Sequence, residues 1–244
     1  MKKILLPLIL CASLMAGCAN ENVNKDEVPE LSPRSLYIAA TNYMASGDWT
    51  RARQYLEAMD QRFPFGELSE QVQLDLIYVY YKSRESEMTT AQINRYLRLS
   101  PTSQYVDYVL YMRGLNAIQK RGNILQEFVG LNRAQKDPTE YFEALKDFKE
   151  LIETYPESIY APDARQRMLF IKEQLAQREL MIARYYHERE AFLSSARHCQ
   201  TILFSYRETP YLHDALVLLR DNYERLHLDT PAINVQRVID ASFN

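Results

Sequence analysis

The sequence predicts an all-α protein in which about five pairs of helices stack into a superhelix. Composition is the first indication, because only 6 of the 244 residues are glycine and 10 are proline, too few for the many tight turns of a β-sandwich or barrel. A helix ending then recurs three times, as Phe63-Pro64, Ser100-Pro101 and Tyr155-Pro156. Residues of fixed size also stand at fixed distances before each of these prolines.

These distances define a repeating unit. A small residue stands twelve positions before each proline and a large apolar residue eight positions before it, in the pairs Ala52 and Leu56, Thr89 and Ile93, and Ala144 and Phe148. The small residue lets two helices cross closely, and the large one fills the space between neighbouring pairs. Pairs that recur about every 34 residues are typical of tetratricopeptide repeats. We therefore predict a tetratricopeptide-like α-α superhelix over residues 34–244.

The individual helices follow from local signals. In the first repeat, Gly47-Asp48 is the predicted turn between a helix that contains Leu36 and a second helix that starts at Trp49. Helices are expected over residues 107–120 and 139–154, separated by a long insertion whose apolar residues predict a docked segment. Residues 164–184 are expected to form one or two long helices.

The C-terminal repeats are weaker copies of this unit. A fourth repeat ends at Tyr206-Arg207, with Ser195 in the small position and Cys199 in the large one. A degenerate fifth repeat is expected over residues 211–242, because terminal repeats cap a stack and are atypical. Cys199 is accordingly predicted to be a buried, inert thiol and not a nucleophile.

Residues 1–17 are predicted to be a lipoprotein signal peptide. Two lysines precede a short apolar run, and Ala16-Gly17 stands directly before Cys18. This order is similar to the lipobox of bacterial lipoproteins, which implies acylation of Cys18 and cleavage just before it. Residues 18–33 then form the acylated cysteine and a flexible tether. Ala19 replaces the aspartate that commonly retains lipoproteins at the inner membrane, which implies anchoring in the outer membrane. A plain secretory signal with an incidental cysteine is the alternative.

The chain shows few signs of catalytic chemistry. It contains no glycine-rich phosphate loop, no HExxH zinc motif and no GxSxG motif, so we expect no catalytic residues, no metal and no cofactor. The formal net charge of -3 offers no bulk attraction to nucleic acid. A lipid-anchored hydrolase would need a catalytic constellation that the sequence lacks. The four histidines are predicted to be surface or interhelical residues. The 18 tyrosines fit either core packing or an adaptable surface for peptides.

Several strings make the sequence similar to one family. They are RFPFG at 62–66, QVQLDLIY at 71–78 with YYK at 80–82, RYLRL at 95–99, DYV at 107–109 with YMRG at 111–114, YPES at 155–158, DAR at 163–165 and YYHEREAF at 185–192. Together with the lipobox they resemble the BamD lipoproteins, subunits of the outer-membrane β-barrel assembly (BAM) complex. Asn132-Arg133 stands where that family usually has Asp-Arg, and Arg207 replaces its usual proline.

The resemblance implies a function and two candidate surfaces. The chain would sit on the periplasmic face of the outer membrane, bound to a BamA-like barrel protein through a POTRA domain and to other Bam lipoproteins. Its N-terminal repeats would capture C-terminal segments of unfolded outer-membrane proteins. The predicted substrate groove consists of Tyr80, Tyr81, Arg98, Tyr108 and Arg113, and the predicted BamA contact of Arg189 and Arg197 on the second helix of the fourth repeat.

Three alternatives stay open at this stage. Arg113 could instead make a structural contact between helices, and both Arg189 and Arg197 could simply be solvated. A different periplasmic tetratricopeptide lipoprotein, which scaffolds cell-wall machinery, would share the anchor and the fold but not the strings quoted above.

Overall fold

The protein is built from α-helices. The computed structural model describes residues 28–120 and 137–243, and within those ranges it has ten helices and no strand. The helices are α1 (Pro33–Ser46), α2 (Trp49–Arg62), α3 (Ser69–Lys82), α4 (Ser86–Leu99), α5 (Val106–Lys120), α6 (Thr139–Thr154), α7 (Ala161–His187), α8 (Phe192–Ser205), α9 (Leu212–Arg225) and α10 (Asp229–Phe243). The predicted all-α class is confirmed.

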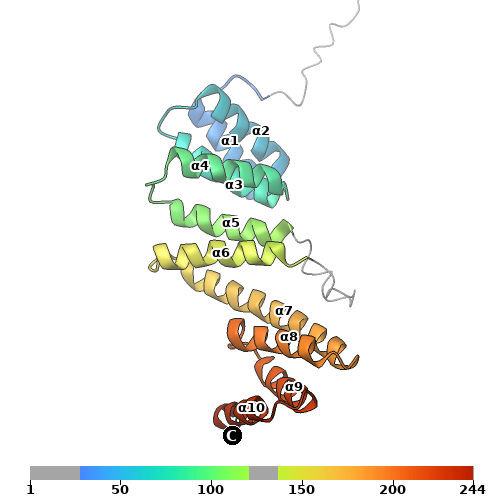
Figure 1. Cartoon of the computed structure of the whole chain (residues 1–244). Coiled ribbons are helices and arrows are strands. Elements are labelled where there is room, and N and C mark those ends of the chain that lie inside the picture. Colours follow the sequence, from blue (N-terminus) through green and yellow to red (C-terminus); the bar gives the residue numbers. More distant parts are fainter. Residues whose placement is uncertain (1–27, 121–136, 244) are drawn as a thin grey trace, which may run out of the picture.

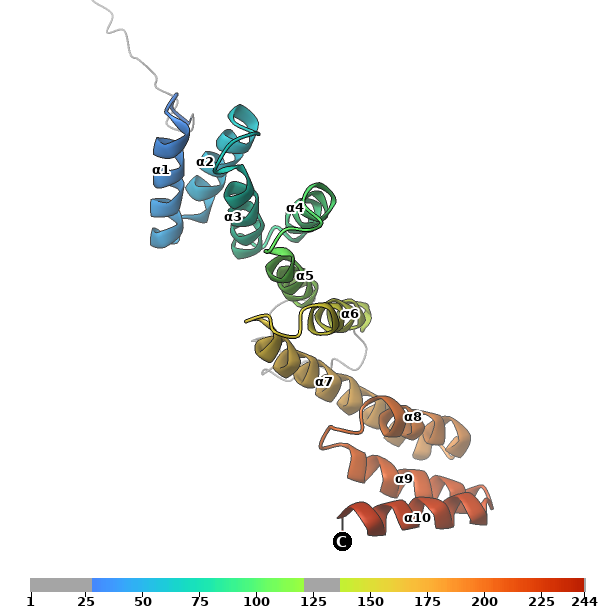
Figure 2. The same cartoon turned by 90° about the vertical axis from the view of Figure 1, so that its left-hand side faces the viewer.

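The helices form an elongated stack of pairs. Each helix packs chiefly against its neighbours along the chain, and the pair α1/α2 lies at one end of the molecule while α9/α10 lies at the other (Figure 1). A view turned by 90° shows the direction of the stack changing along its length, as in a superhelix (Figure 2). Five pairs are present, as predicted. The region expected as one or two long helices is the single 27-residue helix α7.

Local signals explain the first turn. The side chain of Ser32 caps α1 by accepting a hydrogen bond from the Ser35 N–H at 3.2 Å. Gly47 ends α1 with a φ of 77°, a left-handed conformation that favours glycine. Asp48 then caps α2 by accepting from the Arg51 N–H at 3.1 Å. The predicted Gly47-Asp48 turn is confirmed.

The small and large positions predicted at fixed distances before each helix ending lie in the core. The four small positions and the four large ones have no exposed surface: Ala52, Thr89, Ala144 and Ser195, and Leu56, Ile93, Phe148 and Cys199. The polar members of this set are satisfied locally. Thr89 donates to the Glu85 carbonyl at 3.0 Å, and Ser195 accepts from the buried Asn222 amide at 2.8 Å.

Cys199 is a buried thiol, as the register predicted. It lies in a C-terminal core cluster with side chains of α7 and α9 such as Ala183 and Leu216. Burial raises the pKa of its thiol to about 12. The thiolate that nucleophilic chemistry needs is therefore suppressed at physiological pH.

Three of the sequence-based predictions fall outside the described residues. They are the signal peptide, the acylation of Cys18, and the docked segment of the insertion with Asn132-Arg133. Across the ten helices of the described ranges, none combines the length and the apolar character that a membrane crossing requires.

Gly114 gives a direct test of the packing between α5 and α6. A Cβ atom at this position would lie 2.5–2.8 Å from ring carbons of the fully buried Phe148. The Gly114→Ala variant should lose about 1–2 kcal/mol of unfolding free energy, because overpacking outweighs the gain in helix propensity. Urea unfolding followed by circular dichroism measures this loss.

Gly66→Ala is the matched control, because nothing lies within 4 Å of its added Cβ. A Gly114→Ala variant as stable as the Gly66→Ala variant would contradict the close crossing of α5 and α6.

Candidate peptide-binding pocket

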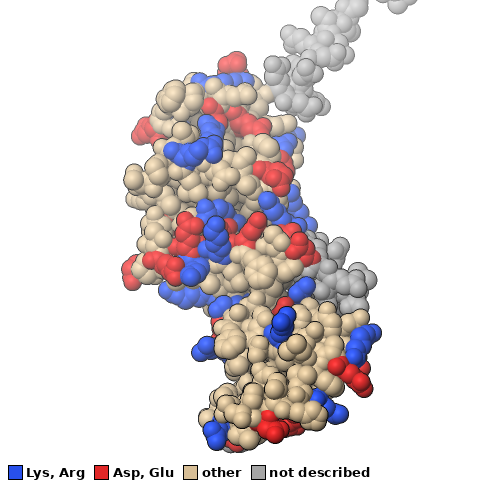
Figure 3. All heavy atoms as spheres, viewed as in Figure 1, with Lys and Arg blue, Asp and Glu red and all other residues tan. Residues whose placement is uncertain are grey.

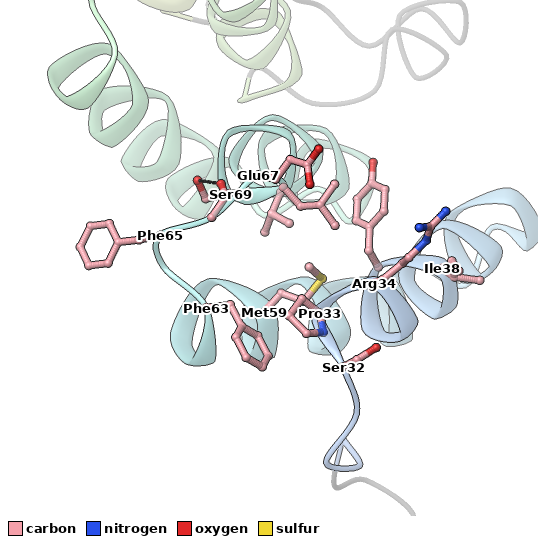
Figure 4. A pocket seen from close by; sticks show the side chains of 13 residues that line it. Ser32, Pro33, Arg34, Ile38, Met59, Phe63, Phe65, Glu67 and Ser69 are labelled. Atoms are coloured by element: carbon pink, nitrogen blue, oxygen red, sulfur yellow. Dashed lines mark hydrogen bonds between the residues drawn. The ribbon is translucent and has the colours of Figure 1, made fainter.

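A pocket of about 730 Å³ opens at the N-terminal end of the stack. The start of α1, the end of α2 and the start of α3 surround it (Figure 4). Met59 and Val72 line it and are almost fully buried, with 3% and 1% of their surfaces exposed. Ile38 and Phe65 also line it but are 52% and 93% exposed. The pocket thus has an apolar floor and an apolar rim that is open to solvent.

The string RFPFG forms one wall of this pocket. Pro64 lies just beyond the end of α2, because a proline has no N–H with which to continue the helix. The chain then turns back into α3, and Ser69 holds the turn by donating its hydroxyl to the Gly66 carbonyl at 2.8 Å. This turn leaves Phe63 half-buried and directs the Phe65 ring away from the pocket centre (Figure 4).

The polar groups of the pocket are mostly satisfied. Tyr37 donates its hydroxyl to one oxygen of Asp75 at 2.9 Å, and the Gln71 amide donates to the other oxygen at 3.0 Å. Burial raises the pKa of Asp75, although these two hydrogen bonds oppose the shift. Arg34 and Glu67 are the charged residues that line the pocket, both are exposed, and neither has an ion-pair partner among the described residues.

Arg62 ties the chain that enters α1 to the wall of the pocket. Its guanidinium donates to the carbonyls of Val28 at 3.0 Å and Pro29 at 2.9 Å. It also pairs with Glu30 at 3.4 Å. Because Phe63 follows Arg62 directly, these contacts connect the entering segment to the pocket.

The predicted substrate groove is corrected in two places. Tyr80 is only 5% exposed and donates its hydroxyl to Glu57 at 2.9 Å, so it packs in the core instead of facing a ligand. Arg113 pairs with Asp147 at 2.8 Å and Glu150 at 2.5 Å. The structural alternative for Arg113, a contact between α5 and α6, is the one observed.

The remaining groove residues do not line the pocket. Tyr81 and Tyr108 are half-buried and pack against the central core cluster. Arg98 is exposed on α4 and has no hydrogen-bond or ion-pair partner among the described residues. Tyr108 belongs to a cluster of rings with Tyr111 and Tyr160, whose centroids lie 4.9–5.7 Å from one another in the contacting pairs. Much of the tyrosine content is therefore structural.

The two residues of the predicted BamA contact lie in different elements, one in a turn and one on a helix. Arg189 lies in the turn after α7, and not on the second helix of the fourth repeat as predicted, because α8 begins only at Phe192. Its guanidinium stacks over the Tyr185 ring, 3.6 Å from the centroid. Arg197 is exposed on α8, and exposed Leu193 and Phe204 stand four residues before and seven residues after it.

Leu193, Arg197 and Phe204 share one helix face at this spacing, and we call them the α8 face. The surface over α8 is mostly uncharged, with scattered Lys and Arg side chains (Figure 3). An arginine flanked by exposed apolar side chains is typical of a protein-binding surface.

Two of the four histidines, His187 and His198, bridge helices, within the predicted range of surface or interhelical positions. His187 contacts Asn222 at 2.9 Å and Asp221 at 3.2 Å, and His198 contacts Glu179 at 2.6 Å. Across residues 28–120 and 137–243, His, Cys, Asp and Glu side chains form no group of three or more that could hold a metal ion.

Comparison with known proteins assigns the chain to a family. The family model for YfiO, an outer membrane lipoprotein, matches residues 29–238. The chain belongs to this family. Relatives named outer membrane protein assembly factor BamD include those of Vibrio cholerae, 39% identical with 90% of each chain covered, and of Neisseria meningitidis serogroup B, 35% identical with 100% of this chain and 92% of the relative covered. The Haemophilus influenzae relative is 33% identical, with 97% and 89% covered.

A solved tetratricopeptide repeat protein from Parabacteroides merdae also resembles the chain. Its TM-score is 0.28 at 15% identity, covering 87% of this chain and 80% of that one. The family membership rests on the sequence relatives, and the fold on the helices described above.

Sequence reasoning missed the residues that close the pocket. No sequence pattern assigned a role in a site to Ile38, Met59, Val72 or Arg34, all of which line the pocket. The available signal was the RFPFG string, because it joins two consecutive helices whose ends must lie beside the start of α1.

Arg113→Ala tests the structural role of this arginine. The change removes the partner of Asp147, whose pKa burial raises and Arg113 lowers. We expect a loss of about 1–3 kcal/mol in unfolding free energy near neutral pH. Without Arg113 the folded Asp147 pKa rises further above its unfolded value, so folding takes up a proton. The loss should therefore shrink as the pH falls toward that raised pKa.

Urea unfolding at several pH values measures this effect. Arg98→Ala serves as the control, since an exposed arginine without a partner should change stability by less than about 0.5 kcal/mol. Equal stability of the two variants at neutral pH would contradict the structural role of Arg113.

Proposed function

We propose that the chain is a lipid-anchored assembly factor of the outer membrane and a subunit of the BAM complex, which holds C-terminal segments of unfolded outer-membrane proteins in its N-terminal pocket. Relatives named outer membrane protein assembly factor match the chain over nearly their whole length. The observation that carries the proposal at the level of this chain is the open apolar pocket at 32–38, 59–69 and Val72.

The pocket suits a segment that ends in an aromatic residue. Its volume falls within the range of small-ligand pockets, about 300–1,000 Å³, and exceeds that of one aromatic side chain. Its floor is apolar and its rim carries the exposed Phe65 ring, against which a second ring could pack edge to face or offset. Burial of an aromatic side chain supplies about 1.5–3 kcal/mol.

Acylation of Cys18 would place the pocket close to the outer membrane, on its periplasmic face. Val28 is only ten positions after Cys18, which limits their separation to about 36 Å. The Arg62 contacts then fix where this tether joins the stack, directly beside the pocket. A captured segment would be held near the bilayer into which it inserts.

The α8 face suits the partner subunit. Arg197 at its centre is free to pair with a carboxylate of a BamA-like POTRA domain, and Leu193 and Phe204 supply apolar contact on either side. Arg189 lies in the turn that precedes this helix, where its stacking on Tyr185 orients the guanidinium. Other Bam lipoproteins would occupy the remaining surfaces of the stack.

Ile38→Glu tests the pocket. Ile38 lines it but is half exposed, so a carboxylate there disturbs the ligand more than the core. We expect the affinity for a fluorescent peptide that ends in phenylalanine to fall about ten-fold or more, because the peptide must bury a charge against its ring. Fluorescence anisotropy with the full-length chain measures it.

Ile159→Glu is the matched control, because Ile159 is 82% exposed and lies outside the pocket. Wild-type affinity in the Ile38→Glu variant, or an equal loss in both variants, would refute peptide capture by this pocket.

Arg197→Glu tests the α8 face. Reversing the charge should reduce co-purification of a POTRA-containing barrel protein from solubilised membranes several-fold, with an effect that weakens as salt is added. Arg165→Glu, on the exposed surface of α7, should leave co-purification unchanged. Full co-purification with the Arg197→Glu variant would exclude the α8 face as this contact.

A further inference from the structure

The pocket holds one cation whose role the packing does not explain. Arg34 lies on α1 at the side of the pocket opposite Phe65 (Figure 4). Its guanidinium is exposed and bonds to no acceptor among the described residues. By contrast, four other arginines of the first two helix pairs each pair with a carboxylate: Arg51, Arg53, Arg62 and Arg95.

The other polar groups around Arg34 are already committed. Ser32 caps α1 through its hydroxyl oxygen, Tyr37 donates to Asp75, and Ser69 donates to the Gly66 carbonyl. The guanidinium of Arg34 is therefore the side-chain donor of the pocket wall that remains available to bind an anionic group of a ligand. The first turn of α1 contains no acidic residue, so the positive end of the helix dipole adds to the charge of Arg34.

We propose that Arg34 recognises the terminal carboxylate of the captured segment, so that the pocket selects the end of a polypeptide over an internal aromatic stretch. This inference rests on the proposed function and names the chemical group of the ligand, the terminal carboxylate, that the pocket binds. A guanidinium binds a carboxylate through two parallel N–H···O bonds. An aromatic residue on the apolar floor would leave its own terminal carboxylate at the rim, where Arg34 stands.

Glu67 gives the bound segment a direction. It lines the pocket, is exposed, and is the one carboxylate among the residues that line it. A terminal carboxylate is repelled by Glu67 and attracted by Arg34. The chain end therefore lies toward α1, and the preceding residues leave past Glu67 and Phe65.

The groove predicted from the sequence contains two other arginines, Arg98 and Arg113. Arg113 is held between Asp147 and Glu150, and Arg98 lies on α4 outside the pocket lining. Neither is placed to meet a carboxylate of a ligand bound over Met59 and Val72.

The experiment compares two forms of one peptide on the full-length chain in detergent. A fluorescein-labelled peptide of alternating polar and apolar residues that ends in phenylalanine is prepared as the free acid and as the C-terminal amide. Wild-type protein should bind the acid about three- to five-fold more tightly at low salt, since the ion pair is partly exposed. The ratio should approach one as salt is added.

Arg34→Gln should abolish the preference for the acid while leaving the affinity for the amide unchanged, which also shows that the variant is folded. Arg34→Lys should keep part of the preference, because it keeps the charge but not the paired geometry. Arg98→Gln should keep all of it, which separates a local contact from a general effect of protein charge.

The outcomes separate this inference from the proposed function. Equal binding of acid and amide by the wild type, or a preference that survives in Arg34→Gln, would overturn the role of Arg34 and leave peptide capture standing. Failure of both peptides to bind the wild type would overturn both.

Discussion

The structure depends on one packing constraint, the close crossing of the two helices in each pair. In the pair α5/α6, a large buried side chain of the second helix faces a position on the first helix that has no room for another atom. Phe148 and Gly114 show it most plainly, since an added Cβ would lie within 2.8 Å of three ring carbons. Because the same register recurs in each repeat, each pair has nearly the same geometry and the pairs stack regularly.

The pocket is a consequence of that stacking. Once α1 and α2 are locked together through Leu36, Ala40, Ala52 and Leu56, the start of α1 and the end of α2 lie at one end of the pair. The short RFPFG turn must then bring α3 back beside them. The array therefore leaves an apolar hollow where three helix ends meet, and Arg62 fixes the entering chain at the same place. Anchor, pocket and first repeat form one unit at the N-terminal end.

The repeat architecture was predictable from sequence because it is local. Prolines, Gly47 and the size register set the helix ends and the buried faces, and both appear where expected. The site was less predictable because its residues come from three helices and depend on exposure. Tyr80 and Arg113 carried the right chemistry but were already engaged by Glu57 and by Asp147. Arg34 lacked any pattern in sequence, since only the packed structure shows that its guanidinium has no partner within residues 28–120 and 137–243.

Depletion of the protein from cells, followed by complementation, tests the central claim most directly. The amount of folded β-barrel protein in the outer membrane is measured after restoring either the wild type or the Ile38→Glu variant at matched protein levels. The account predicts that depletion lowers the level of folded barrels, that the wild type restores it, and that the pocket variant fails to do so. Unchanged barrel levels on depletion, or full restoration by the pocket variant, would contradict it.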